Sequence, residues 1–257
     1  MDSAMILKLG GSVITDKSGE CEIDGEALSA IARCIAGHRR GPLVVVHGAG
    51  SCGHPQAKRF HLQHGLDRGN VSGLYLTHRA VCSLNERVVE EMRGEGIEAV
   101  GIPPLAAALA ENGAIASMEC RPIATMLQHG IVPVLHGDVV MDTVRGAAIV
   151  SGDRLLAFLA TMLGIKRVGL ATDVEGVMDG GVVVKYITPG MVGRLRLGGS
   201  GFEDVTGGMK GKVQELLALA SAGVDAHIFH VRRLGDFMDG REHGGTIVQS
   251  GGMMDDR

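Results

Sequence analysis

Short apolar runs along the chain alternate with longer stretches in which apolar residues recur every three or four positions. The runs Ala4–Leu9 and Leu43–His47 are apolar on both faces, which is typical of strands covered by helices on both sides. Between them, Leu28 and Ile31 fall on one face of a helix that Asp24 can cap. Strand and helix alternate in the same way further on, which predicts βαβ units, an α/β fold and a mainly parallel sheet.

The rest of the chain continues this alternation in order. The pattern predicts further strands at Glu98–Ile102, Ile131–His136, Arg167–Ala171 and Val224–Phe229, helices at Gly73–Met92, Ser151–Leu163 and Met209–Ala222, and a final edge strand at Thr246–Val248. No linker separates the two halves. We therefore expect one domain over residues 1–257, with an N-terminal lobe of about residues 1–150 and a C-terminal lobe of about 151–257.

Composition excludes several classes of protein. Hydrophobic residues make up 45% of the chain and charged residues 21%, as in folded globular proteins. The formal net charge of −4, with no basic block, argues against nucleic acid as a partner. No run is long enough for a membrane span and no signal peptide is visible, so we expect a cytoplasmic protein.

The cysteines are widely spaced and form no Cys-x-x-Cys pair. This spacing predicts reduced thiols and no cysteine-based metal site. The five are Cys21, Cys34, Cys52, Cys82 and Cys120.

The 40 glycines gather at the ends of apolar runs, where a bare backbone can bring its N–H groups close to a ligand. The first such place is Gly10-Gly11, at the end of the first predicted strand. Ligands of open α/β sheets bind at this edge. Lys8 lies within the strand and can offer a point charge to a phosphate. An edge-strand lysine is the default explanation for Lys8 alone, and the adjoining glycine pair favours the functional one.

The second glycine cluster follows the second predicted strand. Gly48, Gly50 and Gly53 match the G-x-G-x-x-G pattern of dinucleotide-binding folds. The match is weakened because the motif follows the second strand, because Pro55 interrupts the expected helix, and because Asp67 sits in a polar turn. An anion-binding nest with a neighbouring histidine, His54, is the better interpretation.

Three further segments carry candidate chemistry. Ser151 can cap a helix whose N-terminus favours anions, although Asp153 in its first turn is equally explained by helix preference alone. A strand runs into Thr172-Asp173, where the carboxylate can contact a ribose or adenine. Lys212 falls in the first turn of a helix, which is unfavourable unless an anion lies there. The loop Gly207–Lys212 is not a Walker A loop, because a spacer residue and the Ser/Thr are missing.

In this order, these segments resemble the amino acid kinase superfamily, and most closely its isopentenyl phosphate kinase branch of the archaeal type. The matching segments are Ile6–Lys17, His47–His54, Pro133–Val139, Ser151–Asp153, Thr172–Val177 and Asp204–Met209. Cys52 stands where the family usually has an aromatic residue. The resemblance implies an open αβα sandwich, a homodimer, and transfer of the γ-phosphate of ATP to isopentenyl phosphate, giving isopentenyl diphosphate. It makes the N-terminal lobe the acceptor lobe and the C-terminal lobe the nucleotide lobe.

The resemblance also implies roles for individual residues. Lys8, Lys17 and Lys212 would neutralise phosphates, His54 would hydrogen-bond the acceptor phosphate, and Asp153 would orient the lysines. The nucleotide site would comprise Lys8, Gly10, Gly11, Ser12, Gly50, Asp173, Val174, Glu175, Gly176, Val177, Met178, Gly208 and Lys212. The acceptor site would comprise Ala49, Gly50, His54 and Gly152. Magnesium would arrive with ATP rather than occupy a protein metal site.

An apolar acceptor tail needs a slot, and the helix Gly73–Met92 offers Leu74, Leu76, Val81 and Leu84 beside Tyr75. Core packing explains these residues equally well.

Three alternative functions stay open from the sequence. The first is a kinase of the same superfamily that acts on fosfomycin, another small phosphonate or an amino acid. The second is an NAD(P) oxidoreductase built on Gly48–Gly53, and the third is a non-catalytic nucleotide-binding protein.

Overall fold

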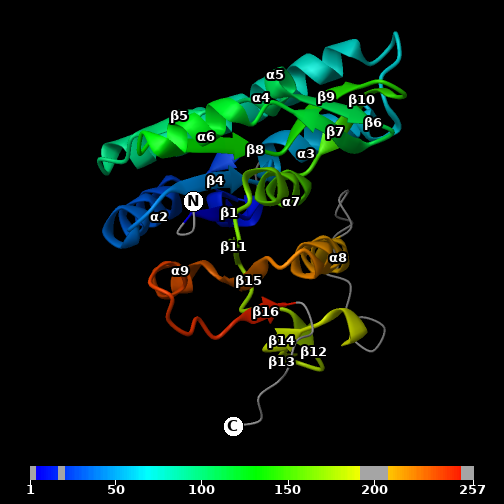
Figure 1. Ribbon diagram of the computed structural model, residues 1–257. Coiled ribbons are helices and arrows are strands. Elements are labelled where there is room, and N and C mark those ends of the chain that lie inside the picture. Colours follow the sequence, from blue (N-terminus) through cyan, green and yellow to red (C-terminus); the bar gives the residue numbers. More distant parts are fainter. Residues whose placement is uncertain (1–3, 17–20, 192–207, 250–257) are drawn as a thin grey trace.

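A computed structural model describes residues 4–16, 21–191 and 208–249, and its centre is an eight-stranded sheet (Figure 1). The order is β14-β16-β15-β11-β1-β4-β8-β5: Tyr186–Ile187, Thr246–Val248, Asp225–His230, Arg167–Thr172, Met5–Leu9, Leu43–His47, Val132–His136 and Ala99–Gly101. The strands from β15 to β5 are all parallel, and only the β15–β16 pair is antiparallel. The predicted mainly parallel sheet is therefore confirmed.

Helices cover both faces of this sheet, so the fold is the expected αβα sandwich. The first face carries α2, α4 and α9 (Gly25–His38, Val71–Gly94 and Leu234–Met238), and the second carries α6, α7 and α8 (Arg121–Gln128, Gly152–Leu163 and Gly208–Ser221). Successive side chains of β1 point to opposite faces of the sheet. Ile6 therefore packs in the core beneath α6, α7 and α8, and Leu7 packs in the core beneath α2, α4 and α9. Both side chains have no exposed surface, which explains why β1 reads as an unbroken apolar run.

A second sheet of four strands was not predicted. It has the order β10-β9-β6-β7, formed by Gly146–Val150, Asp138–Asp142, Ala108–Glu111 and Ala114–Met118. Its strands are rich in alanine, so their alternation of apolar and polar residues is weak. The turn between β6 and β7 is Asn112-Gly113, and both residues have positive φ angles, of 49° and 87°. This dipeptide is a strong hairpin signal that could have revealed the sheet.

Short elements complete the fold. They are α1 (Gly11–Ile14), α3 (Gly50–Arg59), α5 (Pro104–Ala107), the 3₁₀ turns η1 (Leu62–His64), η2 (Pro189–Met191) and η3 (Val231–Arg233), and the strand pairs β2–β3 (Thr15–Asp16 with Glu22–Ile23) and β12–β13 (Met178–Asp179 with Val182–Val183).

Two predicted helix caps are confirmed. The carboxylate of Asp24 accepts a hydrogen bond of 2.9 Å from Ala27 N, and the hydroxyl of Ser151 accepts one of 3.2 Å from Arg154 N. The expectation that Thr246–Val248 forms an edge strand is wrong. This strand lies between β15 and β14, because the short strand β14 adds itself outside it.

The prediction of five reduced cysteines is also wrong. Cys21 and Cys52 form a disulfide, whereas Cys34, Cys82 and Cys120 are free. Spacing in the sequence could not reveal the pair, because the two residues meet only once α3 folds beside the β2–β3 hairpin. The bond ties that hairpin to α3.

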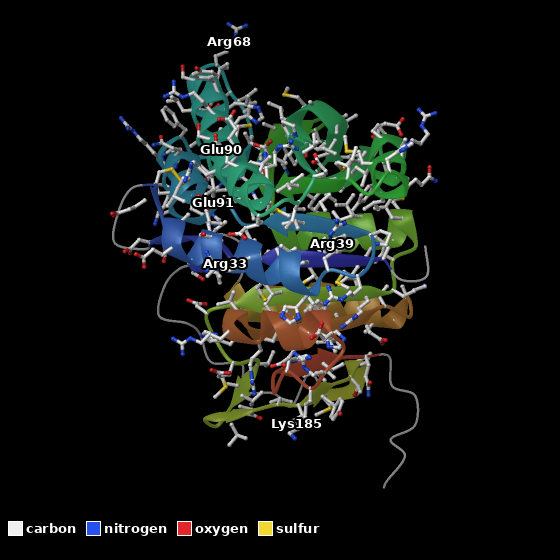
Figure 2. The ribbon with its side chains drawn as sticks, turned by 90° about the vertical axis from the view of Figure 1, so that its left-hand side faces the viewer. Arg33, Arg39, Arg68, Glu90, Glu91 and Lys185 are labelled. Atoms are coloured by element: carbon white, nitrogen blue, oxygen red, sulfur yellow. A yellow bond between two sulfur atoms is a disulfide. The ribbon has the colours of Figure 1, made fainter. Side chains whose placement is uncertain are left out.

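The outer surface of α2 and α4 carries charges of both signs. Figure 2 shows Glu90 and Glu91 on α4 above Arg33 of α2, with Arg68 and Lys185 at opposite ends of the molecule. Arg87 pairs with both glutamates, at 2.6 and 2.9 Å, and such exposed pairs stabilise the fold only slightly. Among the residues that the structure describes, no helix is long and apolar enough to cross a membrane.

Reduction of the Cys21–Cys52 bond is expected to lower the free energy of unfolding by roughly 3 kcal/mol, because it frees a long loop in the unfolded chain. Denaturant unfolding with and without a dithiol measures this change. The double variant Cys21→Ser/Cys52→Ser is the control and should not respond to the dithiol. A count of five titratable thiols in denatured, unreduced protein would contradict the disulfide.

Candidate active site

The candidate site residues gather at the carboxyl ends of the central parallel strands. Gly10 follows β1, Gly48 follows β4, Gly137 follows β8 and Asp173 follows β11. β1 lies between β4 and β11, so the chain leaves it in one direction towards β4 and returns on its other side at β11. Ligands of open α/β sheets bind at such a switch point, which places the site above β1.

Two glycine turns meet above β1 and form what we call the glycine cradle, comprising Gly10, Gly11, Gly48 and Gly50. A Cβ on Gly11 would lie 2.6 Å from both the N and the Cα of Gly50, closer than real Cβ contacts come. A Cβ on Gly48 would lie 2.8 Å from Gly11 N. Gly50 also adopts a positive φ of 53°, which other residues rarely take. Only glycine allows the two backbones to approach this closely.

Hydrogen bonds fix the cradle to the sheet and to the β2 strand. Gly48 N donates to Leu9 O at 3.0 Å, which joins the two turns at their base. The hydroxyl of Thr15 donates to Gly11 O at 2.9 Å and accepts from Ser51 N at 3.1 Å. Thr15 therefore bridges both halves of the cradle. This role could not be predicted from the sequence, because Thr15 is distant along the chain from the second glycine cluster.

Lys8 is buried in β1 and its ammonium group is paired. Only 5% of the residue is exposed, and Nζ lies 2.7 Å from Oδ1 of Asp153 in α7. This contact contradicts the alternative of a plain edge-strand lysine. It also agrees with the expectation that Asp153 orients a lysine. A Cβ on Gly152 would lie 3.2 Å from Cε of Lys8, so glycine at that position leaves room for the lysine stem.

A second ion pair lies beside the first and was missed by sequence reasoning. Arg154 of α7 lies 3.3 Å from Glu215 of α8. The pKa of the Glu215 carboxyl is raised, first by burial and then by the nearby charge of Asp153. Lys8, Asp153, Arg154 and Glu215 thus form one cluster of alternating charge. Lys212 belongs to α8, one turn before Glu215. The structure describes its backbone but not its side chain.

The α3 segment carries the other acceptor-site candidates. Ala49 is the residue before α3, and His54 is half-buried on this helix. Contrary to the sequence argument, Pro55 does not interrupt the helix, which continues to Arg59. Proline has no N–H for Ser51 O, and that carbonyl instead accepts from Cys21 N at 3.2 Å.

The other candidates have different outcomes. Ser12 is half-buried in α1, and Gly208 begins α8. Lys17 lies outside the described residues.

The segment proposed for the nucleotide, Asp173 to Met178, is mixed in exposure. Asp173, Val174, Glu175 and Met178 are exposed, whereas Gly176 is buried. Val177 has no exposed surface, its N–H donates to Thr246 at 2.8 Å, and its carbonyl accepts from Val184 N at 2.8 Å. Val177 therefore has a packing role, which departs from the expected nucleotide contact.

The predicted tail slot is only partly supported. Val81 and Leu84 have no exposed surface and belong to the cores, whereas Tyr75 is 58% exposed. Leu74 instead contacts a small separate apolar cluster beside α3 and β10; the cluster comprises Leu62, Val139, Ala147, Phe60, Leu66, Leu74 and Ile149. A cavity of about 140 Å³ adjoins this cluster and also touches Ser151 at the start of α7.

Comparison with known proteins agrees with this geometry. Residues 3–230 match the amino acid kinase family, and the chain belongs to that family. It is 41% identical to the isopentenyl phosphate kinase of Haloferax volcanii over 96% of this chain and 99% of that protein. A crystal structure of an isopentenyl phosphate kinase superposes with a TM-score of 0.83 at 34% identity, covering 95% of this chain and 99% of the other. The structure of a substrate complex of such a kinase gives a TM-score of 0.78 at 26% identity, covering 95% and 100%.

Gly11→Ala is expected to reduce kcat/KM for phosphoryl transfer at least ~100-fold, because the new methyl group forces the two halves of the cradle apart. Steady-state kinetics measure the loss. Gly37→Ala on α2 is the matched control, since a Cβ there meets nothing within 4 Å and should leave kcat/KM unchanged. Wild-type kinetics in a folded Gly11→Ala variant would contradict the close approach of the turns.

Proposed function

We propose that this chain transfers the γ-phosphoryl group of ATP to isopentenyl phosphate, giving ADP and isopentenyl diphosphate. The observation that carries the proposal is the buried Lys8–Asp153 pair directly beneath the glycine cradle. A cation at that depth suits a site that must hold phosphate groups. The relative with 41% identity over nearly the whole chain, an isopentenyl phosphate kinase, supports the particular reaction.

The two substrates approach the cradle from opposite sides of β1. The nucleotide lies over the C-terminal lobe, against the exposed residues that follow β11 and the start of α8. The acceptor lies over the N-terminal lobe, with its phosphate near Ala49, His54 and Gly152. Gly10, Gly11 and Gly50 line the space between the two substrates, where backbone N–H groups can face phosphate oxygens.

The chemistry requires alignment more than proton transfer. An acceptor phosphate oxygen attacks the γ-phosphorus in line, a P–O bond to it forms, and the bond to the ADP oxygen breaks. The acceptor is already an anion near neutral pH, so a strong general base is not needed. Lys8 offsets the charge that gathers on the transferred group, and Asp153 fixes the direction of its ammonium. His54 donates a hydrogen bond to the acceptor phosphate.

Magnesium accompanies ATP in this proposal. Among the described residues, no three His, Cys, Asp or Glu side chains are grouped so that they could hold a metal ion. In this proposal the ion is held mainly by phosphate oxygens and water, which is the usual mode for nucleotide-bound Mg²⁺. The ion would supply further charge neutralisation between the β- and γ-phosphates.

An isoprenoid acceptor is favoured over the other acceptors by the small apolar cluster. Phe60, Leu66 and Leu74, the partly buried members of the cluster, offer hydrocarbon surface next to α3, the helix that carries His54. Fosfomycin and other small phosphonates have less apolar surface to bury, and an amino acid would bring a charged amine to this place.

The oxidoreductase alternative is weakened by Asp67, the residue that would have to bind the ribose. Its carboxylate accepts hydrogen bonds from Gly69 N at 2.6 Å and Asn70 N at 3.0 Å. It thus caps its own exposed turn rather than standing at a strand end.

Assembly as a homodimer remains part of the proposal and can be measured by light scattering.

Coupled ADP release with isopentenyl phosphate, dimethylallyl phosphate, fosfomycin and N-acetylglutamate as separate acceptors tests the assignment. We expect isopentenyl phosphate to give the highest kcat/KM, because it combines a phosphate for the cradle with a branched apolar tail for the cluster at Leu74. N-acetylglutamate should give no rate above background. A preference for fosfomycin, or nicotinamide nucleotide binding without ATP use, would overturn the proposal.

A further inference from the structure

His47 is the last residue of β4 and has no exposed surface. Its ring lies between the end of the strand and α4. Nδ1 is 3.0 Å from the carbonyl oxygen of Gly48, and Nε2 is 3.0 Å from Oδ1 of Asn85. The imidazole therefore contacts the backbone of the glycine cradle directly, from the side opposite the substrates. Nothing in the proposed chemistry uses this residue.

The ring must be neutral in this environment. Burial lowers the pKa of His47, and the positive charge of Lys8 lowers it further. A neutral imidazole has a single N–H, and a carbonyl oxygen can only accept. The bond to Gly48 therefore requires the proton on Nδ1. Nε2 is then an acceptor, so the amide of Asn85 must turn its NH₂ group towards it, a choice that the hydrogen-bond network decides.

This bond determines the direction of the next amide group. The peptide between Gly48 and Ala49 is trans, and in a planar trans peptide the C=O and the N–H point in opposite directions. When His47 holds the carbonyl of Gly48 towards α4, the N–H of Ala49 points away from α4. Gly152 and the start of α7 lie on that other side, because α7 covers the face of the sheet opposite α4. They are also close, since a Cβ on Gly152 would be 3.0 Å from His47 O.

We propose that His47 is a positioning residue that aims the Ala49 amide at the acceptor phosphate, and that the Gly48 carbonyl selects the tautomer that makes this possible, with the amide of Asn85 turned to match it. The inference rests on the proposed function for its kinetic readout. It concerns the ground-state geometry of the cradle, since the ring itself does not touch either substrate.

A second histidine provides an internal comparison. His136 ends β8, is the register partner of His47, and likewise has Nδ1 near the next carbonyl, at 3.2 Å from Gly137 O. Burial lowers the pKa of His136 to about 3, so it too is neutral. The N–H that follows, however, belongs to Asp138, which is paired with Val150 inside the second sheet. At His136 the same contact therefore orients a peptide within the second sheet, and no N–H group is turned towards an acceptor.

The test compares His47→Leu with His47→Asn, because asparagine keeps an N–H donor at the place of Nδ1 whereas leucine removes it. We expect His47→Leu to raise KM for isopentenyl phosphate about 10-fold while KM for ATP stays within about twofold, since one oriented hydrogen bond to a charged group is lost. His47→Asn should recover most of this loss. His136→Leu is the control and should lower stability without raising KM for isopentenyl phosphate.

A spectroscopic readout separates this inference from the proposed function. Histidine ¹³C and ¹⁵N shifts should report the Nδ1–H tautomer for His47 in the wild type. This measurement needs no substrate and applies even where His47→Leu does not fold. If the wild type failed to phosphorylate isopentenyl phosphate but showed this tautomer, only the function would fall. An Nε2–H tautomer, an unchanged KM in folded His47→Leu, or an equal rise in His136→Leu would overturn the positioning role.

Discussion

The ion pair between Lys8 and Asp153 is the interaction on which the site depends. Two charges have been taken out of water at the centre of the molecule, at a distance of 2.7 Å. Such a pair contributes little net stability, because desolvation offsets most of the attraction. Its value is positional, since it ties the first strand to the N-terminus of α7 and holds a cation beneath the cradle. The surrounding glycines exist because the lysine stem and the two turns need the space.

The arrangement also explains how one protein can bring two anions together. Repulsion between the acceptor and the nucleotide is the main obstacle to this reaction, and a rigid set of positive and N–H groups removes it before the substrates meet. Three contacts around the glycine cradle make it rigid. Thr15 joins the two turns, His47 fixes one peptide between them, and the Cys21–Cys52 bond ties α3 to the neighbouring hairpin.

The sequence predicted the central sheet well, because β1, β4 and β8 are buried on both faces and read as unbroken apolar runs. It also located Lys8, Gly11 and Asp153, which lie beside predicted strand and helix ends. It missed Thr15 and Glu215, whose roles arise only when distant segments meet. It placed Val177 in the nucleotide site, because a motif position does not show whether a side chain faces the ligand or the core. The four-stranded sheet was missed because its alanine-rich strands carry almost no hydrophobic alternation.

The most direct test of this account is the kcat of the double variant Lys8→Met/Asp153→Asn, measured beside its thermal unfolding. Replacing both partners leaves no unpaired buried charge, so the protein should unfold at nearly the wild-type temperature. We predict that kcat for isopentenyl phosphate falls by about 1,000-fold, because the cation beneath the transferred group is gone. A double variant that is folded and turns over at close to the wild-type rate would contradict the central claim.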